Sequence, residues 1–233
     1  DDYKPYLYKT TDYGKSWTNL SANFPQDQIT RTIREDKVRK GLLFAGTESG
    51  VYYSLNDGQS WEKLRANLPS VPVVDMKIKD VDLVIATNGR GFWIMDDITP
   101  LREAGQEVSS KSVHLYPVSD HTRFGYNWWM DYFPGGDPGM KKNYFVQNMR
   151  PGLTYYELTF KQVNGERKRK FIDAGDPKPL GPVFYFKLDK EPSDISVAIL
   201  DQDGKEIRNY SKDDMMLNIG SENGFNAGLN KFV

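Results

Sequence analysis

Short apolar segments separated by turn residues run through the first hundred residues. Ile29–Glu35 alternates between apolar and polar side chains, Leu42–Thr47 is a run of small and apolar residues, and Gly50–Ser54 is aromatic. Together with Ser60–Arg65 they predict four short β-strands in succession. Further strands are predicted at residues 6–9 and 16–20 before this set, and at 73–78, 83–87 and 92–95 after it.

The segment between the third and fourth predicted strands is repeated. Residues 10–17 (TTDYGKSW) recur as residues 54–61 (SLNDGQSW), and residues 22–25 (ANFP) recur in the same register as residues 66–69 (ANLP). A period of about 40–45 residues is typical of a four-stranded propeller blade. The repeat therefore predicts that neighbouring sheets of the first hundred residues have the same construction.

The repeated octapeptide resembles the Asp box, or BNR repeat, of sialidases, sortilin-type propellers and several glycoside hydrolase families. This resemblance implies that the motif residues hold the turn and are not catalytic. The chemistry agrees, because a carboxylate can accept backbone N–H bonds in a turn and glycine adopts positive φ without strain. A tryptophan can fill the gap between neighbouring sheets. The motif residues are Thr10, Asp12, Gly14, Trp17, Ser54, Asn56, Asp57, Gly58 and Trp61.

Residues 1–96 hold too few strands for a closed propeller, which needs roughly four to eight blades. We therefore expect about two C-terminal blades of a longer propeller, with the remaining blades of the parent chain as partners. The last blade, in which residues 86–94 repeat residues 45–53, lacks a fourth strand, and we expect the parent's N-terminus to supply it. Residues 86–102 are similar to the closing segment of large exported bacterial Asp-box proteins. That resemblance implies a periplasmic, cell-surface or extracellular location.

Polar turns of the blades are candidates for ligand binding. In an antiparallel meander, successive turns alternate between the two faces of the sheet stack. This geometry places Glu48 on the same face as Asn88 and Arg90 of the next blade. These residues either contact a ligand in the propeller mouth or are ordinary polar turn residues.

The second half predicts another all-β domain after a linker. Residues 97–112 are polar and lack aromatic side chains, which is typical of a linker with a short helical turn at residues 101–104. Hairpins are predicted at residues 154–172 around Asn164-Gly165 and at residues 195–210 around Asp203-Gly204. Residues 113–233 thus predict an immunoglobulin-like β-sandwich whose last strand, from residue 230, is cut short. Residues 175–233 resemble a FlgD-type immunoglobulin-like domain.

Aromatic residues make up 13% of the chain and concentrate in one segment of the second half. Residues 124–133 hold six of them, including Tyr126, Trp128 and Trp129. Exposed aromatic faces can stack on sugar rings. The alternative is that this segment packs against the sandwich or the propeller.

Composition excludes several classes of protein. The net charge of −1 gives no overall attraction to nucleic acid, and the absence of cysteine excludes disulfides and thiolate metal sites. No apolar run is long enough to span a membrane, and the turn at residues 201–204 lacks the further ligands of a calcium loop. His114 and His121 accompany no nucleophile motif, and no cofactor is expected.

These observations predict an all-β chain, a partial propeller followed by an immunoglobulin-like sandwich, with no catalytic residues of its own. Its expected role is structural or binding, with a polysaccharide or a protein as ligand. The alternative is that it belongs to a sialidase- or xyloglucanase-like glycoside hydrolase whose catalytic carboxylates lie on other blades.

Overall fold

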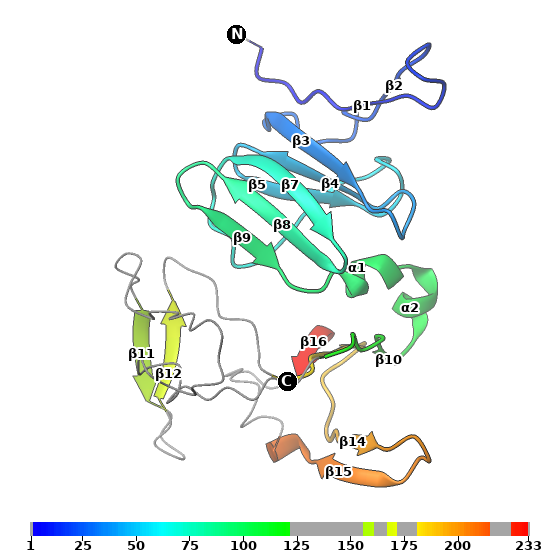
Figure 1. The fold of residues 1–233 in the computed structure, drawn as a ribbon, viewed down its shortest axis with the longest axis vertical. Helices are drawn as coiled ribbons and strands as arrows, with labels where there is room; N and C mark the ends of the chain where they lie inside the picture. The colour runs from blue at the N-terminus through cyan, green and yellow to red at the C-terminus, as the bar shows by residue number, and fades with distance from the viewer. Residues whose placement is uncertain (1, 122–155, 161–166, 172–180, 215–224, 233) are drawn as a thin grey trace, which may run out of the picture. The chain divides into compact units, whose positions relative to one another are not determined.

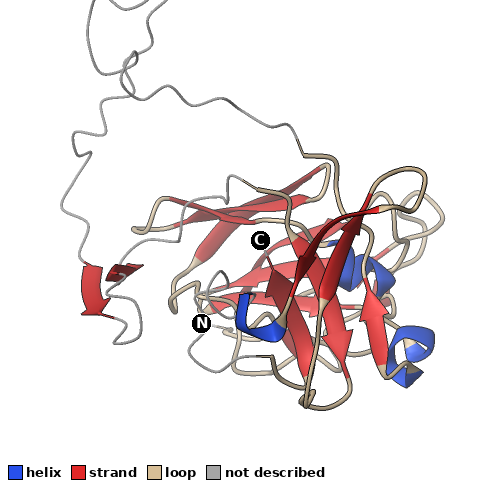
Figure 2. Ribbon diagram, turned by 90° about the horizontal axis from the view of Figure 1, so that it is seen from below, coloured by secondary structure: helices blue, strands red, loops and turns tan. Residues whose placement is uncertain are grey.

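The computed structural model describes residues 2–121, 156–160, 167–171, 181–214 and 225–232. Their regular structure consists mainly of short antiparallel strands with a few short helical segments (Figure 2), so the chain is all-β as predicted. Tyr126, Trp128 and Trp129 lie outside the described residues. No helix in the described ranges has the length and apolar character needed to cross a membrane.

Three antiparallel sheets follow one another in the first hundred residues (Figure 1). The first contains β1 (Tyr8–Lys9) and β2 (Thr18–Asn19). The second contains β3 (Thr30–Glu35), β4 (Leu43–Thr47), β5 (Gly50–Ser54) and β6 (Glu62–Lys63). The third contains β7 (Val73–Lys79), β8 (Asp82–Thr87) and β9 (Phe92–Met95). We call them sheets 1, 2 and 3.

Each strand of sheets 2 and 3 forms where the sequence predicts one. Both sheets are meanders in which consecutive strands pair, with Ala45 opposite Tyr52 in sheet 2 and Ile85 opposite Trp93 in sheet 3. β6 is shorter than the strand predicted at residues 60–65, because only Glu62 and Lys63 pair with β5. Sheet 2 therefore has four strands, and sheet 3 has three.

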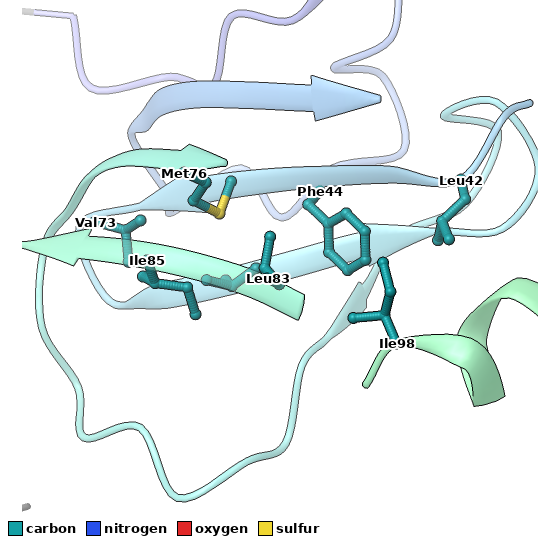
Figure 3. Packing of buried hydrophobic residues seen from close by; sticks show 8 residues of the cluster. Leu42, Phe44, Val73, Met76, Leu83, Ile85 and Ile98 are labelled. Carbon is teal, nitrogen blue, oxygen red and sulfur yellow. The ribbon is translucent and has the colours of Figure 1, made fainter. Parts of the chain in front are cut away.

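The main hydrophobic core lies between sheets 2 and 3 (Figure 3). Phe44 and Val51 of sheet 2 pack against Met76 and Leu83 of sheet 3, and all four are nearly or fully inaccessible to solvent. Each fully buried side chain of this size contributes about 1.5–3 kcal/mol through the hydrophobic effect. The remaining buried members of this core are Leu42, Val73, Ile85 and Ile98.

A second core joins sheets 1 and 2. Phe24, which follows β2, lies with its ring centroid 5.0 Å from that of Tyr52 and 5.2 Å from that of Trp61. Leu7 and Ala45 complete the buried part of this cluster. The aromatic residues of the repeat thus pack between one sheet and the next.

Two short helices occupy the segment predicted as a linker, α1 (Thr99–Glu103) and α2 (Gln106–Ser110). Pro100 stands in the first turn of α1, where its missing N–H costs no hydrogen bond. The side chain of Arg102 donates to both carboxylate oxygens of Asp36, at 3.0 and 2.8 Å. This ion pair fixes α1 to the turn between β3 and β4.

The second half contains the predicted hairpins as separate small sheets. β11 (Tyr156–Phe160) pairs with β12 (Arg167–Phe171), and β14 (Val197–Leu200) pairs with β15 (Glu206–Tyr210). A further sheet of this half has the strand order β10 (Val113–Leu115), β13 (Phe184–Leu188) and β16 (Gly228–Phe232).

The chain divides into two compact units. One comprises residues 1–117, 184–194 and 225–230, and the other comprises residues 118–183, 195–224 and 231–233. The three sheets of the first hundred residues therefore belong to the same unit as β10 and β13.

Candidate functional site

Sheets 2 and 3 carry the same irregularity in their first strands. β3 shifts register between Thr30 and Thr32, and β7 shifts between Val73 and Asp75. Each strand thereby gains one unpaired residue, Arg31 in β3 and Val74 in β7. β-Bulges of this kind redirect side chains and are common beside binding sites. A bulge at the same place in two successive repeats singles out this part of the molecule.

An open hollow of about 490 Å³ lies at the two bulges. It is within the volume range of small-molecule sites, although its lining is more polar than in a drug-like pocket. β3 and β7 contact each other and form its main wall, and the residues before β1 close one side. The lining residues are Tyr6, Leu7, Thr30, Arg31, Thr32, Ile33, Arg34, Val74 and Asp75.

The charged side chains of the hollow are arranged as ion pairs. Nε of Arg31 donates to Oε1 of Glu48 at 2.6 Å, and the guanidinium of Arg34 pairs with the Asp75 carboxylate. Arg34 also donates to the carbonyl oxygens of Ile33 and Met76, each at 2.7 Å, and so ties the edge of β3 to β7. The charges inside the hollow are therefore balanced, while a third or more of each side chain remains accessible to solvent.

Hydrogen bonds between main chain and side chain fix the side of the hollow that the residues before β1 close. Oγ1 of Thr30 accepts the Tyr6 N–H at 3.0 Å and donates to the Tyr6 carbonyl oxygen at 3.2 Å. The hydroxyl of Thr32 makes a longer hydrogen bond than that of Thr30, donating to Oδ1 of Asp75 at 3.4 Å. The hollow thus offers a guanidinium, carboxylate oxygens and a hydroxyl on rigid strands.

The two repeated octapeptides, called the first and second box below, form matching turns, the first between β1 and β2 and the second between β5 and β6. In the first box, Oγ1 of Thr10 accepts the Gly14 N–H at 2.8 Å, and Oδ1 of Asp12 accepts the Ser16 N–H at 2.9 Å. The second box repeats this arrangement. Oγ of Ser54 accepts the Gly58 N–H at 2.9 Å, and Oδ1 of Asn56 accepts the Ser60 N–H at 2.9 Å.

Positive φ angles also recur at the same two places of each box. Tyr13 and Gly14 have φ of 59° and 89°, and Asp57 and Gly58 have φ of 60° and 83°. The hydrogen bonds to Ser16 and Thr10 lower the pKa of Asp12 to about 2. Asp12 thus bonds to Thr10 and Ser16 of its own turn.

The tryptophans of the two boxes differ in their surroundings. Trp61 packs in the core between sheets 1 and 2, and its Nε1 donates to the carbonyl oxygen of Leu20 at 3.3 Å. Trp17, at the equivalent position of the first box, is 61% exposed. The ion pair of Lys9 with Asp57, at 2.6 Å, is a second link between sheet 1 and the second box.

The predicted ligand residues take different places. Glu48 reaches the hollow through its ion pair with Arg31. Asn88 and Arg90 lie in the turn between β8 and β9 and do not line the hollow; the Asn88 N–H donates to the Pro72 carbonyl oxygen at 2.9 Å, and Arg90 is exposed.

Sequence reasoning missed the residues that line the hollow. The available signal was the presence of charged and hydroxyl side chains, Arg31, Arg34 and Asp75 among them, in the first strand of each repeat. The bulges themselves leave no distinctive sequence pattern, so the convergence of these side chains could not be seen before the fold was known.

Two features outside the hollow have local roles. Oδ1 of Asp201 accepts the N–H groups of Asp203 and Lys205, at 3.0 and 2.9 Å, inside its own hairpin turn. Nε2 of His114 lies 3.0 Å from Oε2 of Glu103, which links β10 to α1. In the part of the chain that the structure describes, no three His, Asp or Glu side chains are grouped to hold a metal ion.

Comparisons of this chain with protein-family models, with curated proteins and with solved structures found no match in any of the three. The site is therefore interpreted from its own geometry.

Proposed function

We propose that residues 1–96 are successive blades of an Asp-box β-propeller whose hollow binds a neutral, polar ligand, either a glycan or an exposed protein loop. The observation that carries this proposal is the repeat of two features in register: the box turn in sheets 1 and 2, and the bulge in the first strand of sheets 2 and 3. Repeated units of about 44 residues that each form an antiparallel sheet are the usual construction of propellers.

Exposed apolar residues of sheet 3 support the view that another blade of the parent protein packs on this sheet. Val51 and Tyr53 of sheet 2 lie in the core covered by sheet 3. Their equivalents in β9, Phe92 and Ile94, are 80% and 58% exposed. A sheet packed on sheet 3 as sheet 3 packs on sheet 2 would cover both. These further blades are the partners that the proposal requires.

The chemistry of the hollow favours a neutral ligand. Since Arg31 and Arg34 already bind Glu48 and Asp75, an anionic ligand would have to displace a carboxylate from a guanidinium. Sugar hydroxyls or peptide groups, in contrast, can add hydrogen bonds to the remaining donor and acceptor positions of both ion pairs.

The same pairing supports binding over hydrolysis by these residues. A glycosidase needs one carboxylic acid that donates a proton and one free carboxylate. Glu48 and Asp75 both accept hydrogen bonds from guanidinium groups, which ionised carboxylates do. We therefore propose a binding module, exported from a bacterial cell, in which residues 113–233 form an immunoglobulin-like sandwich.

A binding screen with a matched pair of variants tests the proposal. The full chain is titrated with neutral polysaccharides and with sialosides, and binding is measured by calorimetry together with an assay for released reducing sugar. We expect at least one neutral glycan to bind, about tenfold to a hundredfold more weakly to Arg31→Ala, since a hydrogen bond to a charged group contributes about 1.5–3 kcal/mol. Arg65→Ala, an exposed arginine outside the hollow, is the control and should bind normally.

Two results would contradict this function. Equal binding by Arg31→Ala and the unaltered chain would place the ligand elsewhere. Released sugar would establish a hydrolase and reject the binding-only proposal.

A further inference from the structure

The turn between β8 and β9 carries an asparagine that is followed by a glycine. Asn88, Gly89 and Arg90 are all exposed at its tip. The base of the turn is closed by Thr87, whose N–H and hydroxyl donate to the Gly91 carbonyl oxygen at 3.0 and 2.7 Å. Among the asparagines that the structure describes, Asn88 is the one that precedes glycine. This pair of residues is therefore open to water on a turn whose ends are fixed.

The side-chain amide of Asn88 and the backbone N–H of Gly89 make no hydrogen bond to any described residue. The Asn88 N–H, in contrast, donates to the Pro72 carbonyl oxygen at 2.9 Å and holds the start of the tip. Gly89 has φ of 90°, and a Cβ built there would meet no atom within 4 Å. Because glycine has no side chain, nothing bulky hinders the approach of its nitrogen to the Cγ of Asn88.

Asn56 of the second box provides a matched contrast within the same chain. Its Oδ1 accepts the Ser60 N–H at 2.9 Å, and its Nδ2 donates to Oγ of Ser60 at 2.9 Å. The N–H of the next residue, Asp57, donates to the Gly41 carbonyl oxygen at 2.9 Å. The side-chain amide and the following backbone nitrogen are therefore both engaged at Asn56, whereas no described residue engages either group at Asn88.

We propose that Asn88 is a site of spontaneous deamidation, a self-modification of the folded chain whose only co-reactant is water. The Gly89 nitrogen attacks Cγ of Asn88, a new C–N bond closes a cyclic imide, and the Cγ–Nδ2 bond breaks. The amide nitrogen leaves as ammonia and takes the proton that the Gly89 nitrogen loses. Water then opens the imide at either carbonyl carbon, which yields aspartate or isoaspartate at position 88.

The modification changes the charge and the backbone of this turn. Either product places a carboxylate close to Arg90 in the sequence and makes the net charge of −1 more negative by one unit. Isoaspartate also inserts a methylene group into the main chain between positions 88 and 89. Asn88 and Gly89 do not line the hollow, so this inference is independent of the function proposed for the hollow.

Ageing of the full chain at neutral pH, followed by tryptic peptide mapping, measures the reaction at single asparagines. Trypsin releases residues 80–90 and residues 41–63 as separate peptides, so Asn88 and Asn56 are followed independently. Electron-transfer fragmentation distinguishes isoaspartate from aspartate in each peptide. We expect Asn88 to convert at least about tenfold faster than Asn56, which corresponds to about 1.4 kcal/mol in activation free energy.

Two free peptides, residues 84–92 and residues 52–60, separate the effect of structure from that of the neighbouring residue. Each peptide gives the rate of its asparagine without the contacts of the folded chain. We expect folding to slow Asn56 at least about tenfold more than it slows Asn88, because only Asn56 has both reacting groups engaged. In Asn88→Gln, whose longer side chain disfavours the ring closure, the peptide of residues 80–90 should remain unconverted.

Two results would overturn the inference. One is failure of Asn88 to convert faster than Asn56 in the folded chain. The other is a difference of less than about tenfold between the two asparagines in the slowing caused by folding. Glycan binding by the hollow is measured separately on fresh protein, so either result leaves the proposed function untouched.

Discussion

Asp12 and Asn56 occupy the same position in the two box turns although they differ in charge. Asp12 accepts hydrogen bonds from Ser16 N and Oγ, whereas Asn56 accepts from Ser60 N and donates through Nδ2 to Ser60 Oγ at 2.9 Å. The serine hydroxyl can rotate to act as donor or acceptor, which allows both pairs. The position therefore requires an acceptor oxygen directed at one backbone N–H, and a negative charge is dispensable.

Asp12→Asn should leave the urea midpoint of unfolding nearly unchanged, whereas Asp12→Ala should lower it. The amide of asparagine reproduces the bonds seen at Asn56, and alanine leaves the Ser16 N–H without its partner. A lowered pKa of about 2 means that the carboxylate of Asp12 stabilises the fold above about pH 4, and that this contribution is lost as the pH falls toward 2. Asp12→Asn should remove that part of the acid dependence.

Gly46 is required by a close approach between sheets. A Cβ at this position would lie 2.7 Å from Cγ2 of Thr32 and 2.7 Å from Cγ1 of Val73. We expect Gly46→Ala to destabilise the chain by about 1–3 kcal/mol, as overpacking of a core does. Gly105→Ala is the control, because a Cβ there meets no atom within 4 Å. Equal losses for the two variants in denaturant unfolding would contradict the close packing of β3, β4 and β7.

At the scale of elements, a buried ion pair is one of the contacts that hold α1, beside the hydrogen bond from Arg39 to the Arg102 carbonyl oxygen. The Asp36 side chain is fully buried and that of Arg102 is 12% exposed. Burial is the largest single influence and raises the pKa of Asp36. The hydrogen bonds from the Arg102 side chain and the Arg39 N–H, together with the positive charge of Arg102, outweigh it and lower the pKa of the carboxyl group. The pair fixes the start of the segment that leaves sheet 3.

Replacing one partner of this pair should be costly. Arg102→Met leaves the Asp36 carboxylate buried without its counter-charge, so we expect a loss of about 3–5 kcal/mol in the free energy of unfolding. Lys111→Met, which breaks the exposed pair with Glu107, should change it by less than about 0.5 kcal/mol. A loss below about 1 kcal/mol for Arg102→Met would show that the ion pair contributes little beside the hydrogen bonds from Arg39 to the carbonyl oxygens of α1.

For the whole molecule, acid should destabilise the fold. Since the pKa of Asp36 is lower in the folded chain than in the unfolded chain, its contribution is present above about pH 4 and disappears as the pH falls below that value. Thermal unfolding between pH 7 and pH 2.5 should show a falling Tm below pH 4. Asp36→Asn should show a shallower fall, and an identical slope in both proteins would exclude Asp36 as a source.

The sequence predicted the strands of sheets 2 and 3 because their alternation and turn residues are local signals. It also indicated the box turns, whose hydroxyl, carboxylate and glycine lie within five residues of one another. The hollow could not be predicted in the same way. Arg34 and Asp75 meet only through the packing of β3 on β7, and residues 41 positions apart give no local pattern of contact.

Packing of Trp61 on the preceding sheet is the central claim, because the proposed blade arrangement depends on it. A double-mutant cycle on Trp61→Ala and Leu20→Ala, measured by urea unfolding of the full chain, tests it directly. We predict that the two losses are not additive, with a coupling free energy of about 0.5–3 kcal/mol. Additive losses would show that Trp61 does not pack on sheet 1 and would contradict the account.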